Sequence, residues 1–257
     1  MNRGVAFCVG IVFVAGAIHD EAAAADSRAE IQVNLCGDPE SLLQLLTLAE
    51  KGKPTTVWLF DSADLELNRA GLRLRLRQQG RRSELTLKRA GQDCAAIQDA
   101  DLQPDGKCEA DLHGASMDDV VSLTQAIDAH ARRALLAPER ARGAPLVEAL
   151  SASLNDNQRR ALAAQAGATD RSAPLPPAIV RLGPSTVRSY GTRSQPYVVE
   201  IWTLPGGQRF VELSEKVRRD RALVRRADIL RHLAATGVEV CRDQESQAKR
   251  KLTLMAR

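Results

Sequence analysis

Residues 72–77 carry the pattern that most constrains what this chain can fold into. Leucine and arginine alternate strictly there, with Arg73, Arg75 and Arg77 in the odd positions. Successive side chains of a β-strand point to opposite faces, so the three arginines share one face and the leucines share the other. The segment therefore predicts a strand with one cationic face and one apolar face.

A second alternating segment follows the turn signal at residues 80–82. Polar residues and Lys88 share one face of residues 84–88, and leucines share the other. If the two segments form a hairpin, Arg73, Arg75 and Lys88 point into one volume. The alternation alone fits two structures, which are the wall of a barrel whose polar lumen holds a polyanion and the solvated face of an ordinary sheet.

The rest of the chain continues with strands and adds helices. Strands are predicted at residues 30–35, 57–60, 72–78, 84–89, 107–112, 179–190, 197–204 and 209–217. A helix is predicted to start at Asp38-Pro39-Glu40, because Asp caps a helix and Pro suits its first turn. Alanine-rich residues 118–166 show helical spacing and predict a helical insertion at about residues 115–172, and residues 219–235 predict a basic amphipathic helix.

Composition limits the kinds of partner. The chain has 257 residues, enough for one elaborated domain, and its net charge of +4 favours phosphate-rich ligands. Aromatic residues make up only 3%, which argues against a base-stacking surface, so no nucleic acid is expected as a partner. Arginines crowd the helix expected at 219–235, and such a run is usually a solvated face, with contact to nucleic acid or an anionic membrane as the alternative.

The N-terminus predicts an export signal over residues 1–25. Arg3 precedes an apolar run, and the alanines that end at Ala25 offer a signal peptidase site. Cleavage there leaves residues 26–257 as a periplasmic or secreted protein with no membrane span, because no later segment reaches the length of about 20 apolar residues that a span needs. An uncleaved membrane anchor is the alternative.

Four cysteines remain after removal of the signal, which permits two disulfides with three possible pairings. Cys94 and Cys108 are close in sequence and bracket a turn containing Pro104 and Gly106, so they are the favoured pair. The other two are Cys36 and Cys241, and isolated buried thiols are the alternative. The sequence contains no Cys/His cluster of the kind that binds zinc.

Three short blocks of this chain resemble a known family. Phe60-Asp61 with Asp64, Gly71-Leu72-Arg73-Leu74-Arg75 and Leu85-Thr86-Leu87-Lys88 resemble the F-D-T-x-D, G-x-x-L-R-x-R and L-T-x-K blocks of the CYTH domain. This domain defines the triphosphate tunnel metalloenzymes, and the resemblance covers most of residues 29–257. It implies an α+β fold, with an eight-stranded antiparallel β-barrel that forms a tunnel, a helical insertion and C-terminal helices.

The resemblance also implies a set of site residues. The side chains expected to bind phosphate are Arg73, Arg75, Lys88, Arg188 and Lys216, with Arg77 near the tunnel mouth. The carboxylates expected to bind Mg²⁺ or Mn²⁺ are Glu30, Glu109, Asp111, Glu200 and Glu212. Of these, Glu109 and Asp111 are the expected catalytic residues.

The chain departs from the family at three acidic or basic positions. The first-strand pattern E-x-E-x-K reads Glu30, Gln32 and Asn34, and the second acid of the last strand is Ser214. Hard divalent cations prefer anionic oxygens, so metal affinity should fall. Two hypotheses follow: a metal-dependent hydrolase of inorganic triphosphate, polyphosphate or an organic triphosphate, and a noncatalytic module that binds such anions.

Overall fold

The computed structural model describes residues 28–94, 106–165, 175–244, 252 and 254–255. The predicted signal at residues 1–25 lies outside them. The described strands are β1 (Arg28–Leu35), β2 (Ala49–Glu50), β3 (Thr55–Ser62), β4 (Leu72–Gln79), β5 (Arg82–Ala90), β6 (Gly106–His113), β7 (Ser116–Ala126), β8 (Ile179–Gly191), β9 (Val198–Thr203) and β10 (Arg209–Arg218). The described helices are α1 (Pro39–Leu45), α2 (Glu66–Arg69), α4 (Ala129–Leu136), α5 (Ala144–Ser153), α6 (Asp156–Gln165) and α7 (Ala222–Ala235), with short 3-10 turns at Pro138–Arg140 and Arg219–Arg221.

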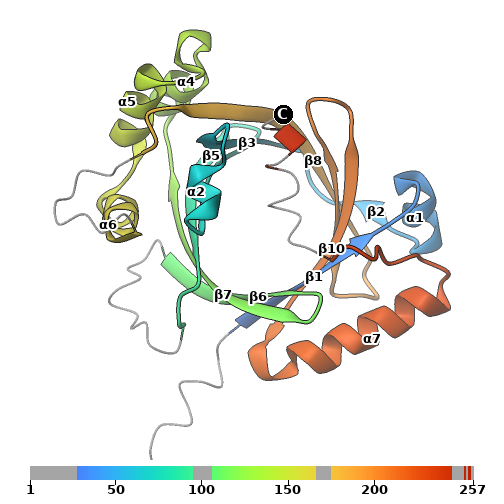
Figure 1. Ribbon diagram of the computed structural model, residues 1–257. Coiled ribbons are helices and arrows are strands. Elements are labelled where there is room, and N and C mark those ends of the chain that lie inside the picture. The colour runs from blue at the N-terminus through green and yellow to red at the C-terminus, as the bar shows by residue number, and fades with distance from the viewer. Residues whose placement is uncertain (1–27, 95–105, 166–174, 245–251, 253, 256–257) are drawn as a thin grey trace, which may run out of the picture.

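Nine of these strands close into a barrel, which Figure 1 shows as a ring. The order around the ring is β8-β3-β4-β5-β7-β6-β1-β10-β9, and β9 pairs back with β8. Strand β2 adds to the edge of β8 outside the ring. The α+β barrel predicted from the sequence is confirmed, although its ring has nine strands rather than eight and its β1–β6 pairing is parallel.

The additional strand is β7, which occupies residues predicted to be helical. Val120, Leu123 and Ile127 have helical spacing, but β7 runs between β5 and β6 and pairs with both. A central strand covered on both faces lacks the simple alternation that marks an exposed strand, so its period is easily mistaken. The helical insertion therefore begins at Ala129 rather than near residue 115.

One group of helices covers the leucine face of β4 and β5. Leu72, Leu74, Leu76, Leu85 and Leu87 form an apolar cluster with buried residues of α4, α5 and α6. The helices are also fastened by hydrogen bonds, because the fully buried Gln158 of α6 donates to one backbone carbonyl of β5 and one of β7. These contacts turn the leucines outward and leave the arginines of β4 facing the lumen.

The opposite side of the barrel is covered by α1 and α7 (Figure 1). Ile229 and Leu233 of α7 pack against outward residues of β1, β6, β9 and β10. The helix is also held by a bidentate ion pair, in which Arg225 donates two hydrogen bonds of 2.8 and 2.9 Å to the buried Glu215. The basic helix predicted from the sequence is thus largely a structural cover for the barrel.

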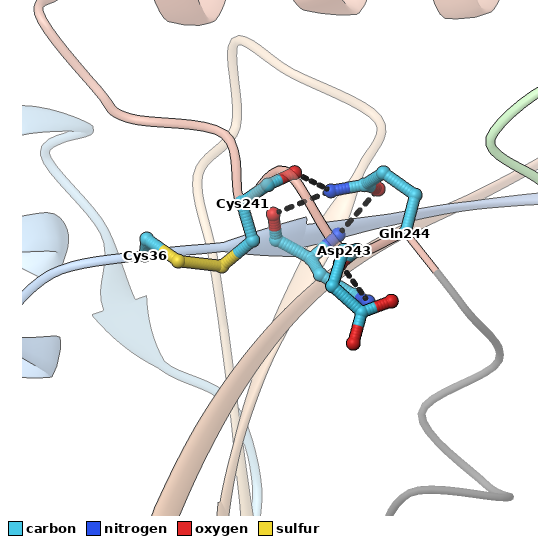
Figure 2. Close-up of a disulfide and its surroundings, with 5 residues drawn as sticks. Cys36, Cys241, Asp243 and Gln244 are labelled. Carbon is cyan, nitrogen blue, oxygen red and sulfur yellow. Dashed lines mark hydrogen bonds between the residues drawn. A yellow bond between two sulfur atoms is a disulfide. The ribbon is translucent and has the colours of Figure 1, made fainter.

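Two disulfides are present, Cys94–Cys108 and Cys36–Cys241. The first is the pair favoured by the sequence, and the second joins the end of β1 to the segment after α7. Figure 2 shows the second bond with its surroundings. Within the described residues, no helix is both long and apolar enough to cross a membrane.

Candidate functional site

The strand β4 presents its three arginines to the interior of the barrel. Its register with β5 places Arg73 opposite Lys88, so the two strands of the hairpin add their charges on one face. Arg73, Arg75, Arg77 and Lys88 all line a cavity of about 460 Å³. The hairpin prediction from the sequence is therefore confirmed in geometry.

The cavity draws its lining from most of the barrel strands. Its charged lining residues are Glu30, Arg73, Arg75, Arg77, Glu84, Lys88, Lys107, Glu200, Glu212 and Lys216. Two further cavities adjoin it along β4. Arg73 also lines one of about 380 Å³, and Arg77 also lines one of about 230 Å³. The polar space thus follows the length of the strand, which places Arg77 toward one end of it as the sequence predicted.

Arg75 lies at the middle of this stripe and carries a strongly perturbed charge. Burial, with the neighbouring charge of Arg77, lowers the pKa of Arg75 to about 9. Its Nε is inaccessible to solvent and has no hydrogen-bond partner among the described residues. A buried donor without an acceptor is costly, so the position favours an anion.

Asp111 is shared by two cations in what we call the Asp111 cluster, formed by Arg73, Lys88 and Asp111. Its Oδ2 lies 3.9 Å from Arg73 Nη2 and 3.7 Å from Lys88 Nζ. These distances give electrostatic attraction, and this buried oxygen accepts no hydrogen bond from the described residues. Burial lowers the pKa of Lys88, and Asp111 offsets only part of that effect. One positive charge therefore remains in excess.

A second group, the Glu109 cluster, consists of Lys107, Glu109 and Lys216. Lys107 donates to Glu109 at 2.7 Å, and Lys216 donates to the same carboxylate at 2.9 Å. Burial raises the pKa of Glu109, but the hydrogen bonds and charges of the two lysines outweigh it and lower the pKa overall. This cluster also carries one positive charge in excess.

The two clusters depend on contacts that sequence reasoning did not supply. Glu109 and Asp111 lie two residues apart on one face of β6, and β1 joins β6 to the strand that carries Lys216. Lys107 was not anticipated as a site residue. The signal was present, because Lys107 shares the alternating face of Glu109 and Asp111.

One expected phosphate ligand lies elsewhere. Arg188 points away from the lumen, is about half exposed and forms an ion pair of 3.1 Å with Glu50 of β2. It pairs with Ile201, whose side chain belongs to the outer apolar cluster. The prediction that Arg188 lines the cavity is therefore wrong, whereas Arg73, Arg75, Lys88 and Lys216 do line it.

One residue of the family-like blocks, Asp61, has a structural role. Asp61 is buried and accepts hydrogen bonds from the backbone N–H groups of Ser62, Leu67 and Asn68, which fixes α2 against the end of β3. Burial raises the pKa of Asp61, and these backbone hydrogen bonds oppose that effect. These hydrogen bonds to the backbone account for an aspartate at position 61 without a role in the cavity.

The altered first strand is divided between two roles. Glu30 and Gln32 line the cavity. Asn34 instead binds the segment after Cys241: its side-chain amide donates to the Asp243 carbonyl, and Gln244 exchanges two hydrogen bonds of 3.1 Å with its backbone (Figure 2). The family's lysine position has thus become an anchor for the C-terminal segment.

Three of the five carboxylates expected to bind a metal line the cavity. Glu30, Glu200 and Glu212 line the cavity, but the described residues contain no group of three or more His, Cys, Asp or Glu side chains placed to hold a metal ion. Glu200 accepts from the Trp202 indole and lies 3.7 Å from Arg77. The Mg²⁺ or Mn²⁺ site stays a prediction.

Together the fold and the cavity define a class, a closed β-barrel whose polar lumen is lined by both cations and carboxylates. Neither a protein-family model nor a curated protein matches the sequence. Among solved structures, HpAC1 from Hippeastrum, a proposed adenylyl cyclase with dominant triphosphatase activity, aligns with a TM-score of 0.55 at 15% identity over 87% of this chain and 94% of its own. A proposed adenylate cyclase from Bacillus halodurans gives 0.53 at 13% identity, over 88% and 98% of the two chains. This chain therefore has the fold of the CYTH-like adenylate cyclase and triphosphatase proteins, as its sequence blocks predicted.

Proposed function

We propose that this protein binds a triphosphate or a short polyphosphate in the lumen of its barrel. The observation that carries the proposal is Arg75, whose charged guanidinium is held in a buried position with an Nε donor that has no partner among the described residues. Guanidinium groups bind phosphate oxygens through paired, charge-assisted hydrogen bonds. A phosphate chain at this point would satisfy both the charge and the donor.

The two clusters beside Arg75 support the same ligand. Each places two cations around one carboxylate, so each offers cationic side chains to a further anion. Their carboxylates are two residues apart on β6, which separates them by about 7 Å in a strand. A ligand with several linked anionic groups can reach both clusters and Arg75, whereas a single phosphate reaches only part of them. Arg73 and Lys88 give up no hydrogen bond to Asp111 when they turn to such a ligand.

The relatives in fold agree with this ligand class. HpAC1 is described by its dominant triphosphatase activity, and it shares the barrel at low sequence identity. Likeness at that level concerns the fold, so the proposal rests on the charges of the cavity. We include the export predicted for residues 1–25 in the proposal, which places the binding site in the periplasm or outside the cell.

Metal-dependent hydrolysis of the bound chain is the second candidate. Three carboxylates, Glu30, Glu200 and Glu212, line the same cavity as the arginines and favour it. Glu109 and Asp111, the catalytic residues expected from the family, are each engaged by two cations, which favours binding alone as the first candidate. Activity with Mg²⁺ or Mn²⁺ separates the two.

The test uses purified residues 26–257 and titration calorimetry in EDTA. We expect saturable binding of inorganic triphosphate, at least tenfold tighter than orthophosphate, and loss of that binding in Arg75→Met. Equal affinity for the two anions, or unchanged affinity in the variant, would refute the proposal. Phosphate release is then measured with Mg²⁺ or Mn²⁺. Turnover that disappears in Glu109→Gln would establish the hydrolase, and no turnover in a protein that binds triphosphate would establish the binding module.

A further inference from the structure

The lumen has two unlike sides. Its charged side is built by β1, β4, β5, β6 and β10, to which β9 adds Glu200. Its other side is apolar, where β3, β8 and β9 meet, and includes Val57, Leu59, Val187 and Trp202. Leu59 and Trp202 also line the cavity, so the apolar side adjoins the place where we expect the phosphates.

The C-terminal residues of the chain already cover this apolar side. Leu252 is only 2% exposed and belongs to the same cluster as Val57, Leu59 and Trp202, and Met255 packs against that cluster. The Ser185 hydroxyl also donates to Met255 Sδ at 3.3 Å. In Figure 1 the last described residues of the chain, drawn in red, lie near β3 and β8, in agreement with these contacts.

Because Leu252 and Met255 cover the apolar side, little apolar surface is left for a ligand. Trp202 is 6% exposed and Leu59 is 8% exposed, although both border the cavity. The Trp202 indole N–H is also occupied, because it donates to Glu200 at 3.1 Å. An organic group joined to a bound phosphate chain normally packs against apolar or aromatic surface. Here it would find charged side chains or would have to displace Leu252.

The segment that precedes these residues is fixed as well. The disulfide Cys36–Cys241 joins it covalently to the end of β1, and Gln244 is hydrogen-bonded to Asn34 (Figure 2). The described part of the C-terminal segment is therefore held at two places, once outside the lumen and once within it. Such tethering limits the conformational entropy that the segment would gain by leaving the lumen.

We propose that Leu252 and Met255 fill the apolar side of the lumen and so restrict the site to inorganic phosphate chains. This inference rests on the proposed triphosphate binding and adds the substrate class. Triphosphates that carry an organic group bind weakly because their organic part competes with the chain's own side chains. Burial of one large apolar side chain of this kind corresponds to about tenfold or more in affinity.

The test compares inorganic triphosphate with ATP as the organic probe, by calorimetry in EDTA. In the unaltered chain we expect inorganic triphosphate to bind at least tenfold more tightly than ATP. In Leu252→Ala/Met255→Ala we expect ATP affinity to rise at least tenfold, with the affinity for inorganic triphosphate changed by less than threefold. The matched control is Leu223→Ala, a leucine that is 62% exposed on α7, which should change neither.

The outcomes separate this inference from the proposed function. Failure of the unaltered chain to bind inorganic triphosphate would refute both. Tight binding of inorganic triphosphate, together with equally tight binding of ATP or with no gain in the double variant, would refute the inference alone. Circular dichroism confirms folding, and if the double variant unfolds, Met255→Ala with Leu252 retained takes its place and should show a smaller gain for ATP in the same direction.

Discussion

Arg75 offers a test in which stability and binding change in opposite directions. Burial lowers the pKa of Arg75 to about 9, well below the ordinary value of a guanidinium, and at about 1.36 kcal/mol per pKa unit this difference amounts to ~5 kcal/mol against the charged form. This value is an upper bound for the gain in folding free energy when the charge is removed. Replacement of buried charges by apolar residues of similar size typically stabilises proteins by about 1–4 kcal/mol. We therefore expect Arg75→Met to stabilise the ligand-free protein by about 1–3 kcal/mol.

The same substitution should remove much of the affinity for triphosphate. Each hydrogen bond to a charged group contributes about 1.5–3 kcal/mol, and a guanidinium makes two of them to phosphate. Loss of about 3–5 kcal/mol corresponds to a fall in affinity of roughly 100-fold or more. For a domain of this size, each kcal/mol of added stability raises the melting temperature by about 2–4 °C.

Thermal unfolding by circular dichroism and calorimetry with inorganic triphosphate measure the two effects. Arg188→Met is the matched control, because Arg188 has a similar strand position but lies on the outer face in an exposed ion pair with Glu50. It should change stability by less than about 1 kcal/mol and leave affinity unaltered. If Arg75→Met lowers the melting temperature by several degrees, the guanidinium is a structural group and our interpretation is wrong.

Three further predictions concern the charges and the supports of the site. Burial holds the pKa of Lys88 below its ordinary value, so the ammonium that binds phosphate is lost as the pH rises through that lowered pKa. Triphosphate affinity should therefore fall with rising alkaline pH, and Lys88→Arg should move the fall to higher pH; a fall at the same pH in both proteins would contradict the role of Lys88. Gln158→Leu leaves two buried strand carbonyls without donors and should lower the free energy of unfolding, measured in urea, by about 2–3 kcal/mol. An unchanged free energy of unfolding would contradict a stabilising role for these two hydrogen bonds. The Cys36→Ser/Cys241→Ser variant opens a link across 205 residues and should cost about 2–5 kcal/mol, whereas an unchanged denaturation midpoint would show that the bond adds no stability.

The inward and outward faces of the first hairpin could be read from the sequence. In residues 72–77 each leucine is followed by an arginine, and only one orientation buries the leucines under the helices. Burial of a continuous apolar face is the largest favourable term in folding, so it sets the orientation of the strand. The arginines are then required to face the lumen, and Lys88 follows from the register of the hairpin.

The family resemblance implied that Arg188 binds phosphate, and that prediction failed for a local reason. The pairing of β3 with β8 shifts register between Val57 and Leu59, which is a β-bulge. Leu182 lies on the inner side before the shift, and Val187 lies on that side after it. A bulge inserts one residue and so moves later side chains to the opposite face. Simple alternation counted from Leu182 therefore assigns Arg188 to the lumen, although it lies outside.

The sequence by itself determined a strand with arginines on one face and leucines on the other, because a period of two leaves a strand no other way to bury its apolar side. Tertiary structure alone decided which charges meet. Lys107, Glu109 and Lys216 come together only because β1 lies between β6 and β10, and that pairing is not encoded in any local pattern. It also decided that Leu252, far from β3 in sequence, fills the apolar side of the lumen, since burial depends on which surfaces the closed ring leaves available.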